Sequence, residues 1–330
     1  MPGPGVGRYD VSFESSDGST TVRGYAWWDR DPRDRADACP TAVVLLVHGM
    51  AEHIERYDAF ARWLASRGYL VCGHNQLGHG STSPRERWGC LPAHGGATYL
   101  VEDVERLRQL AMSWCVEGTP CFAFGHSMGS FVVRSYAAHH GDQISGAVVC
   151  GTGFVDPRVS RLGNALARLI ARLRGDDARS RLLHGMADGS YAKKIPARRT
   201  DFDWLSRNRA NVDAYIADDA CGFMFSAGGY ATLTELTAEV CTPECARRVP
   251  PSLPLLYVSG AEDPVGDMGK GVVASAGLAR EAGSTDVTVR LFQGMRHEIL
   301  NEDDAPEVYQ SVLAWLDQRS GATRDREDVA

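Results

Sequence analysis

The fold of this chain is decided by the stretch Cys121-Phe122-Ala123-Phe124-Gly125-His126-Ser127-Met128-Gly129. Residues 121–124 form a short apolar run of strand length, and apolar residues recur at helical spacing over residues 127–140. Between these two segments, the pattern G-x-S-x-G predicts a sharp strand-to-helix turn that lifts a serine hydroxyl above the sheet. We expect Gly125 and Gly129 to be required sterically, because a side chain at either position would collide with the neighbouring strand or helix. Ser127 is therefore the candidate nucleophile, and a turn of small residues without chemistry is the alternative.

Other short apolar runs alternate with segments of helical pattern on both sides of this turn. Strands that are apolar on both faces and separated by helices indicate an α/β fold with a parallel sheet covered by helices on both faces. Two earlier segments joined by the turn Ser-Asp-Gly-Ser predict an antiparallel hairpin, which brings the expected sheet to eight strands. The expected strands are Tyr9–Glu14, Thr20–Trp28, Ala42–Val47, Tyr69–Gly73, Cys121–Phe124, Gly146–Cys150, Leu255–Val258 and Val287–Phe292. The helices predicted between the first parallel strands are Tyr57–Ser66, Tyr99–Glu117 and Ser127–His140.

The alternation breaks over residues 151–250, where a connection of a few residues would be usual. We therefore predict a core of residues 1–151 and 251–320, a mainly helical cap of residues 152–250, and a disordered tail of residues 321–330. One cap segment places apolar side chains on one helix face and most of its arginines elsewhere. That apolar face either packs on the protein itself or rests transiently on a membrane surface. Its members are Val159, Leu162, Leu166, Leu169 and Leu173, and the arginines are Arg158, Arg161, Arg168, Arg172 and Arg174.

Composition restricts the partners and the location. The net charge of −7 over 330 residues argues against nucleic acid as a partner, because phosphate backbones require a concentrated basic surface. The longest apolar runs are far shorter than the ~20 residues that cross a bilayer, and the first residues lack an apolar signal core. We therefore expect a cytoplasmic protein, and the sequence does not indicate its oligomeric state.

A serine hydroxyl becomes a strong nucleophile only when a base removes its proton. His297 follows the last predicted strand and is the candidate general base, while Asp263 follows the seventh strand and is the candidate acid that orients the histidine. The order Ser127, Asp263, His297 is the one expected after a G-x-S-x-G turn. Glu262 and Asp267 are close enough in sequence to be rival acids.

Acyl transfer also requires N–H donors for the negative charge that develops on the acyl oxygen. Met128 directly follows the nucleophile, and Met50 lies in the loop after the third strand, so their backbone N–H groups are the candidate oxyanion hole. Gly49 would let the backbone approach the substrate. With water as the second reactant, these groups complete the reaction, and no organic cofactor is expected.

Histidines and cysteines outside this set do not form a recognisable metal-binding pattern. Cys241 and Cys245 have helical rather than metal-knuckle spacing, and Cys221 gives them no paired ligand set. His48 and His53 are interpreted as structural hydrogen-bonding residues. We therefore predict no metal site.

Five stretches together resemble the monoacylglycerol lipase and lysophospholipase branch of the α/β hydrolases, sometimes grouped with serine aminopeptidases. They are His48–Tyr57 (HGMAEHIERY), Leu77–Ser81 (LGHGS), Gly125–Gly129 (GHSMG), Gly260–Val265 (GAEDPV) and Met295–Glu298 (MRHE), and they span nearly the whole chain in the expected order. The resemblance implies the α/β-hydrolase fold, a catalytic triad of Ser127, Asp263 and His297, and an oxyanion hole at Met50 and Met128. Asn75 and Ser130 depart from the pattern, since the family often has Asp and Gly at these positions, which puts the subfamily in doubt rather than the fold.

The expected activity is the hydrolysis of monoacylglycerols or lysophospholipid-like single-chain esters. The residues expected at the substrate are Gly49, His126, Phe223, Phe225 and Val265. The two phenylalanines, with Met224 and Tyr230, either wall an acyl tunnel or form the core of the cap. The same triad would also serve a peptidase, an acyltransferase or a polyketide-cleaving esterase, and a ligand-binding protein without catalysis is the alternative outside enzymes.

Overall fold

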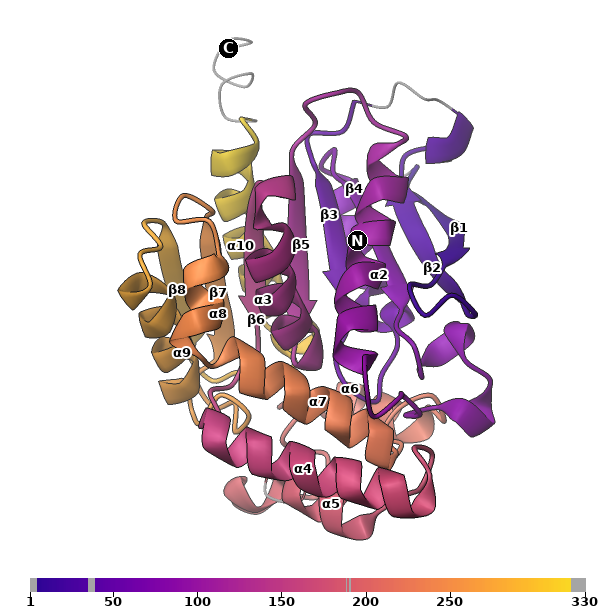
Figure 1. Ribbon diagram of the computed structural model, residues 1–330. Helices are drawn as coiled ribbons and strands as arrows, with labels where there is room; N and C mark the ends of the chain where they lie inside the picture. Colours follow the sequence, from indigo (N-terminus) through magenta and orange to yellow (C-terminus); the bar gives the residue numbers. More distant parts are fainter. Residues whose placement is uncertain (1–4, 35–38, 188, 190, 322–330) are drawn as a thin grey trace.

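A single eight-stranded sheet runs through the molecule, in the order β1-β2-β4-β3-β5-β6-β7-β8 (Figure 1). The structure is a computed structural model, and it describes residues 5–34, 39–187, 189 and 191–321. The β1–β2 and β2–β4 pairs are antiparallel and all other pairs are parallel, which confirms the predicted hairpin and the mostly parallel sheet. The strands are β1 (Gly7–Glu14), β2 (Thr21–Trp28), β3 (Val43–Val47), β4 (Leu70–Asn75), β5 (Cys121–His126), β6 (Gly146–Cys150), β7 (Leu255–Gly260) and β8 (Val287–Phe292).

Helices cover both faces of this sheet, as the continuous apolar runs predict. Successive strand side chains point to opposite faces, so Val43, Leu45 and Val47 of β3 enter one core while Val44 and Leu46 enter the other. The first core lies under α2 (Gly96–Met112), α3 (Met128–His140) and α9 (Lys270–Glu281). The second lies under α1 (Asp58–Ala65) and α10 (Ala305–Ser320).

The structure corrects the bounds of the predicted helices. The helix predicted over Tyr57–Ser66 is one residue shorter at each end, and α2 begins at Gly96, three residues before the predicted start. Helix α2 ends at Met112, five residues before the predicted end, because residues 113–120 turn the chain back towards β5 and Gly118 adopts a φ of 85° in that turn. Helix α3 begins at Met128 and not at Ser127, because the serine has a φ of 53° and a ψ of −120°, which is not a helical conformation.

Among the described residues between β6 and β7, where the alternation of strands and helices breaks, there are five α-helices. Four of them, α4 to α7, lie across the carboxyl ends of the parallel strands, at the bottom of Figure 1. They are α4 (Pro157–Arg174), α5 (Arg181–Ala187), α6 (Arg209–Ala217) and α7 (Ala227–Val240), followed by α8 (Pro243–Arg248), which packs on α3 and α9.

Most of the leucine face of α4 is exposed, although Leu166 packs against the core. Helix α4 packs against α7 through small side chains, and its buried residues are Ser160, Ala167 and Ala171. The side chains of Leu162 and Leu173 are each 73 % exposed. The alternative in which the whole face packs on the protein is therefore wrong, because the small residues make the close contact with α7 and leave Leu162 and Leu173 exposed.

The described residues end at Gly321, so the predicted disordered tail lies almost wholly outside them. Among the helices in the described ranges, none combines the length and the apolar character needed to cross a bilayer.

Candidate active site

The serine of the G-x-S-x-G turn lies between β5 and α3, at the carboxyl edge of the sheet. Its φ of 53° is rare for a residue other than glycine and is typical of strain held at a functional position. A Cβ atom on Gly125 would lie 2.1 Å from the carbonyl oxygen of Gly129, and one on Gly129 would lie 2.2 Å from that of Val47. Both glycines are therefore required by the close approach of backbone, as the sequence predicts.

His297 and Asp263 form a buried pair beside this turn. The His297 Nδ1–H donates to Asp263 Oδ2 over 2.9 Å, and the exposed fractions are 1 % and 0 %. The carboxylate is fixed further by Ser259 Oγ at 3.1 Å and by the backbone N–H of Val265 at 2.8 Å. With Nδ1 holding the proton, His297 Nε2 is the atom that can accept one.

The two rival acids point elsewhere. Glu262 pairs with Arg207 at 2.9 Å, and Asp267 pairs with Lys194 at 3.2 Å. Of the three carboxylates that the sequence left open, Asp263 is the one that binds His297.

The imidazole of His297 lies between two other rings. Its centroid is 4.6 Å from that of His126 and 5.2 Å from that of Trp204. Trp204 belongs to the stretch between β6 and β7, called here the helical insertion. His126 Nε2 donates to the carbonyl oxygen of His297 over 3.2 Å, and its Nδ1 faces Glu52 at 3.4 Å. Burial alone would lower the pKa of His126, but the hydrogen bond and the charge of Glu52 raise it. Sequence reasoning missed Trp204, because its contact with His297 links segments far apart in the chain.

Glu52 is the centre of a buried network that the sequence analysis also missed. It accepts hydrogen bonds from the backbone N–H of Gly49 at 2.5 Å, the Tyr57 hydroxyl at 2.8 Å and Arg56 at 3.1 Å. Arg56 in turn makes two hydrogen bonds, of 2.5 and 2.7 Å, to Glu298. Burial alone would raise the pKa of Glu52, but the hydrogen bond with His126 and the charge of Arg56 hold it well below its ordinary range. The i,i+4 spacing of Glu52 and Arg56 is the one signal in the sequence that could have indicated this pair.

The two residues whose N–H groups are proposed for the oxyanion hole lie at the same cavity as the serine. Met50 and Met128 both line that cavity, and within the described part of the chain neither backbone N–H has an acceptor. The loop is fixed one residue beyond Met50, where the N–H of Ala51 donates to His79 and its carbonyl accepts from Tyr215 Oη at 3.0 Å. Two donors aimed at one point are what an oxyanion requires.

The cavity has a volume of about 520 Å³ and lies between the edge of the sheet and the helical insertion. Ser127, His297 and Glu52 supply polar groups at its wall, and most of the remaining lining is apolar. The apolar lining includes Met50, Met128, Phe131, Trp204, Phe223 and Leu233. Its size and character are those of a site for a small apolar ligand with a few placed polar groups.

Three of the five residues expected at the substrate line this cavity, namely His126, Phe223 and Val265. Phe225 does not: its ring is fully buried against His79 and Tyr230, so the structure corrects this assignment. Gly49 does not line the cavity either. Its N–H donates to Glu52, and an added Cβ would lie 3.0 Å from Ser127 Cβ. Gly49 allows the loop to approach the serine and does not itself face the cavity.

Sheet topology, a strained serine after β5 and a buried histidine–aspartate pair after β7 and β8 together define a serine hydrolase with the α/β-hydrolase fold. The sequence pattern of one family within this class, described as serine aminopeptidase S33, matches residues 38–304. The chain belongs to that family.

Relatives and solved structures carry ester-hydrolase names. The chain is 29 % identical over 283 residues to a monoacylglycerol lipase of Mycolicibacterium smegmatis, which covers 85 % of this chain and 89 % of the relative. It is 26 % identical over 287 residues to the monoglyceride lipase of Homo sapiens, with 85 % and 84 % covered. The crystal structure of a thermostable carboxyl esterase from Bacillus coagulans in complex with glycerol superposes with a TM-score of 0.85 at 27 % identity and covers 95 % of this chain and 99 % of the esterase.

Proposed function

We propose that the protein hydrolyses carboxylic esters through an acyl-enzyme on Ser127, with monoacylglycerols or lysophospholipid-like single-chain esters as substrates. The observation that carries this proposal is the cavity of about 520 Å³, in which a mainly apolar wall meets Ser127 and His297. The relatives named monoacylglycerol lipase and monoglyceride lipase support the same substrate class.

In the proposed reaction, His297 Nε2 takes the proton of Ser127 Oγ as that oxygen bonds to the acyl carbon. Asp263 keeps the imidazole in the required tautomer and stabilises the imidazolium that forms. The charge that moves onto the acyl oxygen is met by the N–H groups of Met50 and Met128, and loss of one such donor costs about 3 kcal/mol in the transition state. His297 then gives its proton to the departing alcohol. Water repeats the sequence on the acyl-enzyme and releases the acid.

A comparison of substrates tests the proposal. Purified protein should hydrolyse a long-chain monoacylglycerol with a higher kcat/KM than a short p-nitrophenyl ester or an aminoacyl amide, and a fluorophosphonate probe should label it. Ser127→Ala should lose both activity and labelling while its circular dichroism stays that of the wild type. A preference for the amide would favour the peptidase and contradict the lipid substrate, and transfer of the acyl group to an added alcohol in place of water would favour an acyltransferase.

We further propose that residues 152–250 act as a cap over the cavity and rest on anionic lipid surfaces through α4. The exposed apolar residues of α4 lie beside exposed arginines, which gives the combination of apolar contact and positive charge that such surfaces attract. The apolar residues are Val159, Leu162, Leu169 and Leu173, and the arginines are Arg158, Arg161, Arg172 and Arg174.

Sedimentation with lipid vesicles measures this contact. Wild-type protein should bind vesicles that contain anionic lipid more strongly than neutral ones, and the double variant Leu162→Gln, Leu173→Gln should lose most of that binding. Val116→Gln is the matched control, since Val116 is an exposed apolar residue in the turn after α2, outside the cap. Equal binding by the double variant would refute the contact through α4. A cytoplasmic location stays a prediction.

A further inference from the structure

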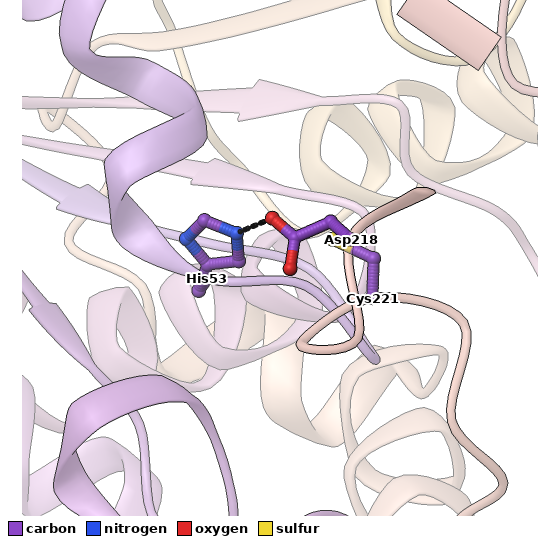
Figure 2. Close-up of side chains that lie close together, drawn as sticks. All are labelled: His53, Asp218 and Cys221. Carbon is purple, nitrogen blue, oxygen red and sulfur yellow. Dashed lines mark hydrogen bonds and ion pairs between the residues drawn. The ribbon is translucent and has the colours of Figure 1, made fainter. Parts of the chain in front are cut away.

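Three side chains of metal-binding type meet where the loop after β3, which carries Met50 and is called here the Met50 loop, adjoins the helical insertion (Figure 2). His53 comes from the loop after β3, while Asp218 and Cys221 come from the loop after α6. The candidate ligand atoms, one nitrogen, one oxygen and one sulfur, all lie within 4.8 Å of one another. His53 Nε2 lies 2.8 Å from Asp218 Oδ2, the contact drawn as a dashed line in Figure 2.

The other nitrogen of His53 is held as it is in metal-binding histidines. Its Nδ1 lies 2.8 Å from Glu55 Oε2, and Glu55 is itself held by the Tyr25 hydroxyl at 3.0 Å. A carboxylate on the second ring nitrogen fixes the tautomer and aims the first nitrogen at an ion. The site is open on one side, because the side chain of Asp218 is 41 % exposed while that of His53 is 14 % exposed.

We propose that His53, Asp218 and Cys221 bind a zinc ion, with water at the fourth position. A thiolate, an imidazole and a carboxylate are ligands that zinc accepts, whereas magnesium and calcium prefer oxygen ligands alone. Three protein ligands with one open position are also a common zinc arrangement. No local sequence pattern indicates this set, because His53 and Asp218 are 165 residues apart.

Zinc replaces two protons in this cluster. In the metal-free protein both ring nitrogens of His53 lie 2.8 Å from a carboxylate oxygen, Nδ1 from Glu55 and Nε2 from Asp218, so both carry a proton that they donate. Binding releases the Nε2 proton of His53 and the thiol proton of Cys221, while the Nδ1 proton stays with the hydrogen bond to Glu55. A histidinium, a carboxylate and a thiol carry no net charge, and neither do a neutral histidine, a carboxylate, a thiolate and Zn²⁺. The exchange therefore leaves the charge of this half-buried cluster unchanged.

The ion would fasten the helical insertion to the loop that carries Met50. The carbonyl of Ala51 already accepts from the N–H of Gly222 at 2.9 Å, next to Cys221. His53 is three residues beyond Met50. Zinc at this point joins the same two segments by ligand bonds and should raise the melting temperature of the full chain.

Cobalt substitution tests the site without reference to activity, so its outcome is independent of the proposed ester hydrolysis. Titration of the reduced protein with Co²⁺ should give a thiolate-to-cobalt charge-transfer absorption that saturates at one equivalent and is displaced by Zn²⁺. Cys221→Ser should abolish the band, and Glu55→Gln should weaken binding by about 10–100-fold. Cys39→Ser, which changes an exposed thiol, is the matched control and should keep the band.

Asp218→Asn provides a second variant in case Cys221→Ser does not fold, since Asp218 is partly exposed. It should weaken zinc binding and remove the zinc-dependent rise in melting temperature. The proposal is overturned if the wild type shows no charge-transfer band, if the band persists in Cys221→Ser, or if it is lost in Cys39→Ser.

Discussion

The substitution Gly129→Ala tests whether the close backbone approach at the turn sets the geometry of the site. The new Cβ would lie 2.2 Å from the carbonyl oxygen of Val47 and 2.6 Å from that of His48, whereas real Cβ atoms essentially never come within 3.0 Å of such atoms. Both obstacles are backbone, so β3 and α3 must separate by roughly 0.8 Å. Overpacking of this kind lowers the free energy of unfolding by up to about 3 kcal/mol. Alanine in place of glycine stabilises a helix by about 1 kcal/mol, so the free energy of unfolding should fall by about 2 kcal/mol in total.

The same displacement reaches the loop that carries Met50. A misplacement of about 1 Å costs on the order of 100-fold in rate, so kcat/KM of Gly129→Ala should fall by roughly that factor. Urea unfolding followed by circular dichroism and hydrolysis of a p-nitrophenyl ester measure the two effects. Gly277→Ala in α9 is the control: an added Cβ there meets no atom within 4 Å. Gly277→Ala should keep full activity, and its free energy of unfolding should rise by about 0.5–1 kcal/mol. Unchanged stability and rate in Gly129→Ala would refute the steric argument.

Two further predictions concern acids of the site. Asp263→Asn should lower kcat by about 10⁴-fold, because the amide does not hold His297 in the required tautomer. Glu262→Gln should leave kcat nearly unchanged, and equal losses in the two variants would contradict the assignment of Asp263. Glu298→Gln removes a partner of Arg56 and should cost about 3–5 kcal/mol at neutral pH. Burial alone would raise the pKa of Glu298, but Arg56 lowers it below the ordinary value of 4.5. The stabilisation by Glu298 is therefore present above about pH 4.5 and is lost as the pH falls through the native pKa. The difference in unfolding free energy between Glu298→Gln and the wild type, measured in urea, should therefore shrink in acid. A difference that stays constant with pH would argue against this charge effect.

Much of the fold follows from patterns that are local in the sequence. A strand buried on both faces is a continuous apolar run, as in β3. A strand-to-helix turn with two glycines can be recognised from five consecutive residues. The order of Ser127, Asp263 and His297 could be predicted because each follows a strand that the pattern had already located. The structure then separates Asp263 from Glu262 and Asp267 by the contacts that each one makes, which no spacing rule could do.

The parts that sequence reasoning missed depend on contacts between distant segments. The pairing of Arg56 with Glu298 joins residues 242 positions apart, and the cluster at His53 joins the core to the insertion. The hydrophobic pattern of α4 located its apolar face correctly but could not say what covers that face. Small residues such as Ala167 and Ala171, which carry little weight in a hydrophobic pattern, make the contact with α7 and leave Leu162, Leu169 and Leu173 exposed.

The Met50 loop is held by the core on one side and by the helical insertion on the other. Glu52 fixes the N–H of Gly49 from the core, and Tyr215 and Gly222 of the insertion hold the carbonyl of Ala51. Ala51 has a φ of 52°, a conformation that costs on the order of 1–3 kcal/mol and persists only where its surroundings impose it. The insertion therefore does more than line the cavity: two of its residues bind the carbonyl of the strained residue that follows Met50. If the N–H of Met50 binds the acyl oxygen as we propose, a shift of the α6–α7 loop should displace this donor through Ala51.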